Sequence, residues 1–143
     1  MITPVTPPPE MPAADVLLLK TAQELLARVW VHGRHEVATA LRAADGNVYT
    51  GVHLEGSCRR SSICAEGVAL GAARGGLPAG SPLLIEAVVS VQIKPAGQFR
   101  IIAPCGVCRE LISDYSPDAT VWITDGSALP ALDLLPEKTR RAW

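Results

Sequence analysis

The hydrophobic residues of this chain follow a helical spacing in some segments and a strand-like pattern in others. The segments with each pattern are the helices and strands that the sequence predicts. Apolar residues recur at helical spacing from residue 13 to about residue 30, and they are Val16, Leu19, Leu25, Leu26 and Val29. This spacing predicts an amphipathic helix. Residues 37–41 and 48–54 are predicted as two strands, joined by Asp45-Gly46-Asn47, which is a strong signal for a tight hairpin.

The second half of the chain continues this alternation. A helix is predicted over about 64–75, with Ser61 or Ser62 as its cap, and the aliphatic run 83–93 predicts a buried strand. The short apolar piece 100–103 continues that strand or closely follows it. A third helix is expected over about 105–114, another strand over 119–124, and a terminal helix over 132–141 that Pro136 could break. The resulting order, α-β-β-α-β-α-β-α, predicts a mixed sheet between layers of helices.

Composition limits the classes of protein that this chain can be. Five of its first twelve residues are prolines, which predicts a Pro-rich flexible tail over 1–12 and a single domain over 13–143. With 48% hydrophobic residues and a net charge of −1, the chain can form a core and lacks the basic balance of a nucleic-acid-binding protein. No apolar run is long enough for a membrane span, and the N-terminus does not resemble a secretory signal, so a cytoplasmic protein is expected.

The cysteines carry the candidate chemistry. Cys64-Ala65-Glu66 begins one predicted helix, and Pro104-Cys105-Gly106-Val107-Cys108 begins another. Helix N-termini favour thiolates, and two such ends converging from neighbouring strands would direct three sulfur atoms at one Zn²⁺ ion. Three protein ligands leave a fourth tetrahedral position for water, and this is the arrangement of a catalytic zinc.

Glu66 lies two residues after Cys64 and is the expected proton shuttle. A zinc ligand two residues before Glu, followed by P-C-x-x-C, is the signature of zinc nucleobase deaminases. The expected chemistry is attack by zinc-bound hydroxide on the ring carbon that bears the amine, with Glu66 carrying the protons. Three alternatives remain: a redox C-x-x-C pair, unreactive buried cysteines, and a closed structural zinc with Cys58 or His53 as its fourth ligand.

These motifs resemble the small cytidine deaminase family, including its blasticidin S deaminase-like members. The resemblance runs through residues 51–58, 63–66, 104–110 and 134–136 and covers the chain from about residue 14. It implies a three-layer α/β/α fold with a five-stranded mixed sheet, one catalytic Zn²⁺, and a homotetramer whose active sites are shared between subunits. It implies a free cytosine nucleoside or an analogue as substrate, with a modified or antibiotic nucleoside of the blasticidin S type as the alternative.

The resemblance also implies the substrate contacts. Glu55 matches a ribose-binding glutamate, and His53 replaces the asparagine that accompanies it. His35 stands near the position of a phenylalanine that packs on the pyrimidine, and the backbone near Ala65 is expected to hold the amine-bearing ring. Further departures from the family pattern are Gly56, Gly67 and Glu110.

In the family that these motifs resemble, an arginine commonly follows C-A-E and can offset the charge of three thiolates, and this position is Gly67 here. Arg109, adjacent to Cys108, is therefore expected to donate hydrogen bonds to the ligand sulfur atoms, and Arg109→Ala is expected to lower turnover far more than zinc content. Arg59 and Arg60 are either a solvated loop corner or contacts to a neighbouring subunit's substrate, and Trp143 is expected to dock on the fold or on a neighbour. Two other functions remain open: deamination of a polynucleotide base, and a zinc-stabilised module without activity.

Overall fold

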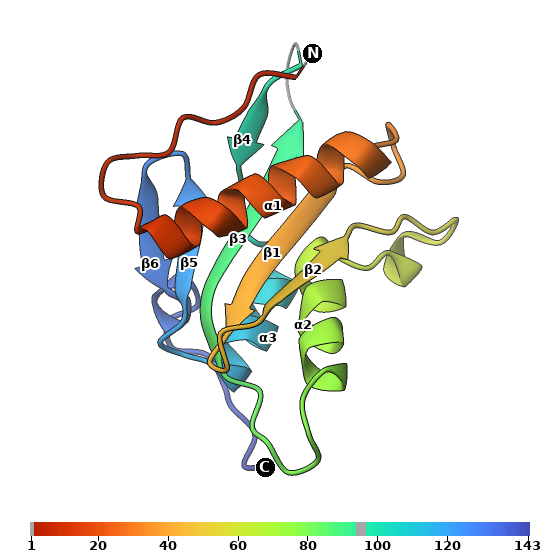
Figure 1. The fold of residues 1–143 in the computed structure, drawn as a ribbon. Helices are drawn as coiled ribbons and strands as arrows, with labels where there is room; N and C mark the ends of the chain where they lie inside the picture. Colours follow the sequence, from red (N-terminus) through yellow and green to blue (C-terminus); the bar gives the residue numbers. More distant parts are fainter. Residues whose placement is uncertain (1, 94–96) are drawn as a thin grey trace.

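The structure is a computed structural model that describes residues 2–93 and 97–143 (Figure 1). Its helices are α1 (Ala13–Val29), α2 (Ala65–Gly75) and α3 (Gly106–Tyr115), with 3₁₀ turns η1 (Arg59–Ser61) and η2 (Ala131–Leu134). Its strands are β1 (Val37–Ala43), β2 (Val48–Val52), β3 (Ile85–Ile93), β4 (Phe99–Ile101), β5 (Thr120–Thr124) and β6 (Ser127–Pro130). Within the described residues, no helix has the length and apolar character that a membrane crossing requires.

One mixed sheet organises the molecule. Its main path has five strands in the order β2-β1-β3-β5-β6, and β4 pairs with β3 as a sixth strand. β3 and β5 are parallel and the other pairs are antiparallel. β5 pairs with the first half of β3, at Ala87 and Val88, whereas β4 pairs with its last part, from Val91 onward. The expected α/β/α fold is confirmed, with β4 as an addition to the expected five strands.

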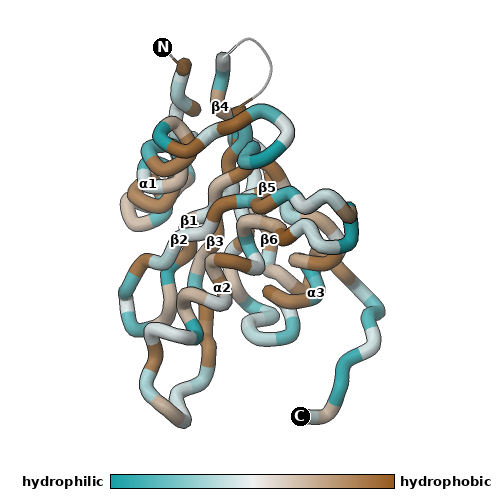
Figure 2. The backbone as a smooth tube through the Cα atoms, turned by 90° about the vertical axis from the view of Figure 1, so that its right-hand side faces the viewer, coloured by the Kyte–Doolittle hydropathy of each residue, from teal (hydrophilic) through white to brown (hydrophobic). Residues whose placement is uncertain are grey.

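Helices cover both faces of this sheet, and the side-chain alternation of β3 explains why. α1 lies across one face, while α2 and α3 lie on the other (Figures 1 and 2). Ala87, Val89 and Val91 belong to the core under α1, whereas Val88 belongs to the core under α2 and α3. Because successive strand residues point to opposite faces, a strand that is apolar on both faces requires a helix layer on each side.

The N-terminal segment packs against the fold, so the expectation of a tail outside it is wrong for residues 2–12. Val5 and Met11 are buried in the core under α1. The Val5 N–H donates to Gln23 Oε1 at 2.8 Å, and the Thr3 carbonyl accepts from the Phe99 N–H at 2.9 Å. The prolines remove backbone donors but leave two large apolar side chains free to bury surface, which is what holds the segment.

The prediction of a terminal helix over 132–141 is also wrong. Residues 127–130 form β6, the 3₁₀ turn η2 follows, and no helix is present over 135–143. Pro130 and Pro136 leave too few residues between them for a stable α-helix. Side chains attach the last residues to α3: the Lys138 ammonium, almost buried, donates to Asp114 Oδ1 and to the Ser113 hydroxyl, both at 2.6 Å.

Candidate active site

Close packing between α2 and β2 sets the position of the first cysteine. A Cβ added at Gly51 would lie 2.3 Å from the Ala65 carbonyl oxygen and 2.5 Å from the Ala69 nitrogen. Only glycine therefore allows the first turn of α2 to approach β2 so closely. Cys64 is the N-cap residue of α2, and neither Ser61 nor Ser62 caps it. The Ser61 hydroxyl donates to the Cys58 carbonyl and the Ser62 hydroxyl to Glu55.

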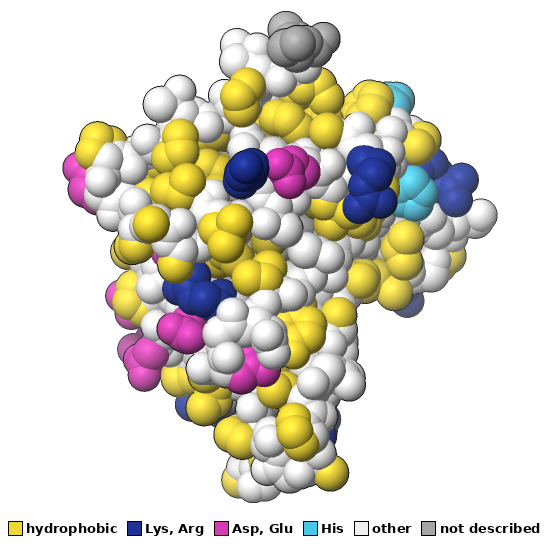
Figure 3. Space-filling model, in the orientation of Figure 1, with side chains coloured by type: hydrophobic (Ala, Val, Ile, Leu, Met, Phe, Trp, Pro, Cys, Tyr) yellow, Lys and Arg dark blue, Asp and Glu magenta, His cyan; other side chains and the backbone are white. Residues whose placement is uncertain are grey.

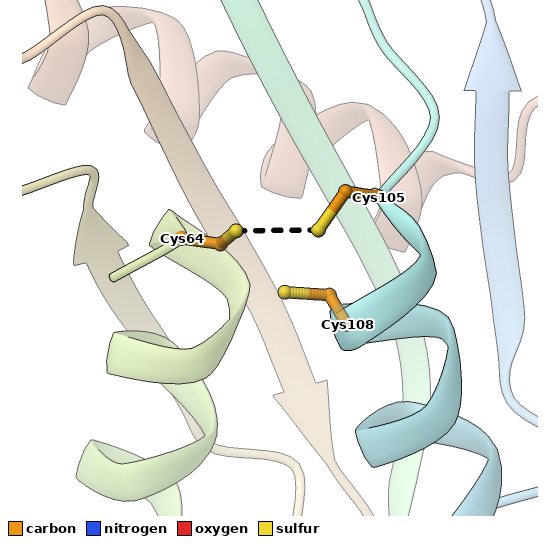
Figure 4. Close-up of side chains that lie close together, drawn as sticks. All are labelled: Cys64, Cys105 and Cys108. Carbon is orange, nitrogen blue, oxygen red and sulfur yellow. Dashed lines mark hydrogen bonds between the residues drawn. The ribbon is translucent and has the colours of Figure 1, made fainter. Parts of the chain in front are cut away.

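Two helix N-termini bring three thiols together (Figure 4). Cys64 precedes α2, Cys105 is the N-cap residue of α3, and Cys108 is buried in the first turn of α3. Their Sγ atoms all lie within 4.8 Å of one another, and those of Cys64 and Cys105 are 3.3 Å apart. Sulfur ligands about 2.3 Å from a tetrahedral zinc are about 3.8 Å apart, so the cluster fits such an ion.

The pKa values of these three thiols are shifted because the thiols lie close to one another and to Glu66. Burial raises the pKa of Cys64 to about 11, and the Cys105 thiol and the Glu66 carboxylate add to this effect. Burial and the Glu66 carboxylate also raise the pKa of Cys108. Burial acts to raise the pKa of Cys105, but hydrogen bonds from the Cys108 backbone N–H and the Cys64 thiol outweigh it and lower that pKa. Three sulfur atoms and a carboxylate so close together need a cation before all of them can ionise.

A fourth protein ligand is absent from the described residues. No histidine, cysteine or carboxylate there joins the three thiols in one group. The Cys58 thiol is exposed, and both ring nitrogens of His53 have other partners: Nε2 lies 3.0 Å from Glu55 Oε2, and Nδ1 accepts from the Glu36 N–H at 3.4 Å. The closed structural zinc that the sequence left open is therefore not supported, and the three thiols leave a ligand position open.

Glu66 lies beside the thiols and is held from behind by the sheet. The residue is 3% exposed, and its Oε1 accepts a hydrogen bond from the Ser90 hydroxyl at 2.8 Å. Ser90 is on β3, so the carboxylate is fixed between α2 and the central strand. This contact was not predicted, because nothing in the sequence pairs positions 66 and 90.

A cavity of about 280 Å³ opens onto Glu66 and two of the thiols. Its lining residues are Glu36, Val37, His53, Cys64, Ala65, Glu66, Gln92, Ile102, Ala103 and Cys105. The structure places His53 and Ala65 at the cavity wall, and their roles toward substrate stay predictions. Sequence reasoning missed Glu36, Gln92, Ile102 and Ala103. The adjacency of the last two to Pro104-Cys105 is the signal that could have indicated them.

Glu55 and His35 do not line this cavity. Glu55 accepts from the Ser62 hydroxyl and from His53, and these hydrogen bonds hold the pKa of Glu55 below its usual value. The His35 ring donates from Nδ1 to the His53 carbonyl at 2.9 Å, so His35 supports the strand end that carries His53. Glu55 and Arg59 line another cavity, of about 610 Å³, and Glu36 lines both.

Arg109 makes contacts other than those expected. Its Nε donates to the Pro104 carbonyl at 2.9 Å and its Nη1 to the Leu134 carbonyl at 3.2 Å. The predicted hydrogen bonds to ligand sulfur atoms are not among its contacts in this structure. Instead, the guanidinium links the residue before Cys105 to η2. The reason is that η2 packs against α3, a tertiary contact that the local sequence does not indicate.

Comparisons with known proteins agree with this site. Blasticidin-S deaminase from Bacillus cereus is 33% identical over 113 residues, which are 76% of this chain and 78% of that protein. Cytidine deaminase from Burkholderia pseudomallei superposes with a TM-score of 0.71 at 27% identity, covering 90% of this chain and 100% of the other. The corresponding values for cytidine deaminase from Mycobacterium leprae are 0.71, 25%, 89% and 100%. No family model matches the chain.

The extent of the match to the Bacillus cereus protein is large enough to establish kinship, and the fold and the thiol cluster agree with it. The chain belongs to the cytidine deaminase family of hydrolytic nucleoside deaminases.

Proposed function

We propose that this protein is a zinc-dependent hydrolase that deaminates a free cytosine nucleoside or an analogue of one. The observation that carries the proposal is the juxtaposition of three thiols, a buried carboxylate and a cavity that reaches both. A structural zinc does not use a non-ligating carboxylate, whereas hydrolytic deamination requires a group that moves protons. The proposed zinc ligands are Cys64, Cys105 and Cys108.

The proposed reaction adds water to the ring carbon that bears the exocyclic amine and releases ammonia. Zinc, when bound by the three thiolates, supplies a Lewis acid that lowers the pKa of water. Glu66 is then the proton carrier: its carboxylate accepts a proton from the attacking water and passes it to the ring nitrogen. Glu66 next moves the proton of the added hydroxyl to the amine, so that the C–N bond breaks, ammonia leaves and a C=O bond forms.

Four residues are proposed to position the nucleoside. The backbone of Ala65, at the first turn of α2, would hold the amine-bearing ring beside Glu66. The half-buried His53 ring would contact a sugar hydroxyl from the cavity wall, and Glu55 would orient that ring through its 3.0 Å contact. His35, hydrogen-bonded to the His53 backbone, would fix the same strand end.

A modified or antibiotic nucleoside is the second candidate substrate. The relative from Bacillus cereus is named as a blasticidin-S deaminase, and its match extends over most of this chain. Glu36 lines this cavity and Glu55 lines the neighbouring one that shares Glu36, so the two cavities together offer carboxylates to a substrate with more hydrogen-bond donors than ribose has.

The proposed assembly is a homotetramer with shared active sites. Val107, Leu111 and Tyr115 recur every four residues along α3, and all three side chains are exposed. An apolar stripe on one helix face is typical of a surface that another subunit covers. Trp143 is 87% exposed, with the Arg141 guanidinium over its ring, so its outer face is accessible to a neighbouring subunit. Light scattering tests this assembly, and a monomer would contradict it.

A nucleic-acid substrate is not part of the proposal. On the face drawn in Figure 3, the described Lys and Arg side chains stand in a few separate places, some of them beside Asp or Glu, and form no continuous basic strip. Binding to single strands needs such a strip with aromatic platforms. A cytoplasmic location is proposed as well, because thiol ligands need a reducing compartment.

An ammonia-release screen of the zinc-loaded protein tests the function. The panel contains cytidine, deoxycytidine, 5-substituted cytosines, blasticidin S and aminopurines, with Glu66→Gln as the control variant. Ammonia from a cytosine nucleoside, absent with Glu66→Gln, would support the proposal. Full zinc loading with no ammonia from any compound would favour a zinc-stabilised module without activity.

A further inference from the structure

Two hydroxyl groups lie in the middle of the sheet, among side chains that are otherwise apolar. Thr39 on β1 is 0% exposed and Ser90 on β3 is 1% exposed, and the two residues are direct partners in the antiparallel register. Their oxygen atoms are 2.7 Å apart. Ser90 Oγ also lies 2.8 Å from Glu66 Oε1, so the two hydroxyls and the carboxylate form one buried chain.

The donor and the acceptor of each of these two hydrogen bonds can be assigned. Each hydroxyl can donate only one hydrogen bond. Ser90 gives its proton to the Glu66 carboxylate, so Thr39 must be the donor in the bond between the two hydroxyls. A hydroxyl that accepts a hydrogen bond becomes a better donor through its own proton, and a low-dielectric surrounding strengthens this effect. Thr39 therefore strengthens the bond from Ser90 to Glu66.

The two carboxylate oxygens of Glu66 consequently differ. Oε1 is anchored by Ser90, whereas Oε2 makes no hydrogen bond to any described residue. No buried side-chain oxygen or nitrogen of the described residues lacks a partner, so Oε2 is reached from the cavity that Glu66 lines. One oxygen holds the carboxylate in place and the other is free to meet a substrate.

We propose that Ser90 and Thr39 are positioning residues that hold the Glu66 carboxylate for proton transfer, with Oε1 as its anchor and Oε2 as its working oxygen. The inference rests on the proposed deaminase function of the same site. It explains why polar groups occupy two fully buried strand positions, where an unpartnered hydroxyl would be destabilising. A hydroxyl pair that served the sheet alone would need no third partner on α2.

The test compares Ser90→Ala with Val88→Ala in the zinc-loaded protein. Val88 is buried two residues away on the same strand, and its side chain cannot hydrogen-bond to Glu66, so its variant reports the effect of a core deletion without the loss of a hydroxyl. The substrate is whichever cytosine nucleoside the wild type converts fastest. Steady-state kinetics, zinc content and thermal unfolding are measured for each variant, and the crystal structure of Ser90→Ala is determined.

We expect Ser90→Ala to lower kcat about tenfold or more, with KM changed less than about twofold and zinc content unchanged. Val88→Ala should unfold at a lower temperature yet keep its kcat. In the Ser90→Ala crystal structure, the Glu66 carboxylate should be rotated or present in more than one orientation. Thr39→Val, which removes only the hydroxyl, should lower kcat by a smaller factor, and Thr39→Ser should restore it.

A kcat of Ser90→Ala within about twofold of the wild type would overturn the proposal, as would a crystal structure with Glu66 unmoved. Equal losses of kcat in Ser90→Ala and Val88→Ala would also overturn it, because the effect would then come from core packing. If the wild type releases no ammonia from any nucleoside, the proposed function fails, and the orientation of Glu66 in the Ser90→Ala crystal still decides the anchoring.

Discussion

Replacing Arg109 tests what holds Cys105, the N-cap residue of α3, in place. The guanidinium donates to the Pro104 carbonyl at 2.9 Å and to the Leu134 carbonyl at 3.2 Å. Hydrogen bonds from a charged donor contribute about 1.5–3 kcal/mol each when buried, and these are only half-buried, with the second one long. We therefore expect Arg109→Ala to cost about 2 kcal/mol of unfolding free energy, or a decrease of about 4–8 °C in Tm.

Zinc affinity should fall with stability in this variant. The Pro104 carbonyl directly precedes Cys105. Without the hydrogen bond from Arg109 to this carbonyl, the turn that carries Cys105 can move. Residues that support metal ligands typically change metal affinity about 10- to 100-fold when they are replaced. Arg109→Lys keeps the charge but cannot span both carbonyls, so about half of each effect should remain in that control.

The measurements are competition with a zinc chelator, thermal unfolding at one protein concentration, and turnover per bound zinc. The structure predicts lower zinc affinity and stability with turnover per bound zinc nearly unchanged. The sequence pattern alone predicts the opposite order, in which turnover falls and zinc content does not. A large loss of turnover at unchanged zinc affinity would refute the structural reasoning and return Arg109 to the role of compensating the thiolate charge.

Three further predictions follow from other contacts. Gly51→Ala should displace the first turn of α2 and reduce zinc content, because its Cβ would overlap the Ala65 carbonyl; metal analysis of the purified variant checks this, and full zinc loading would contradict it. Asp15→Ala should cost about 3 kcal/mol in urea unfolding, since the buried carboxylate accepts from Arg42 at 3.0 Å and from the Trp122 ring N–H at 2.9 Å; a loss under about 1 kcal/mol would refute this. Zinc uptake by metal-free protein should release protons near pH 7, because the pKa values of Cys64 and Cys108 are raised and both thiols must ionise to bind; calorimetry in buffers of different ionisation enthalpy detects this, and no release would contradict it.

The metal ligands could be predicted from sequence because their signal is local. A cysteine at each of two helix N-termini, with a short motif around it, indicates its own environment without knowledge of the rest of the chain. The hairpin turn around Gly46, which has a φ of +87°, is local in the same way. The structure brings Cys64, Cys105 and Cys108 together as that pattern predicts.

The support of the site could not be predicted, because it depends on pairs far apart in the chain. Arg109 and Leu134 are 25 residues apart, and Ser90 and Glu66 are 24 apart. Their contacts follow from how α3 meets η2 and how β3 passes under α2. The packing of the N-terminal segment was missed for a related reason. The number of prolines indicates how the backbone is constrained, whereas the apolar surface that Val5 and Met11 bury holds the segment against the fold.

The deaminase assignment is decided by the zinc content and turnover of the wild type and Glu66→Gln, measured side by side. We expect about one zinc ion per chain in both proteins, ammonia release from a cytosine nucleoside by the wild type, and a loss of turnover of about a hundredfold or more with Glu66→Gln. Equal turnover in the two proteins, or a fully zinc-loaded wild type that releases no ammonia, would contradict it.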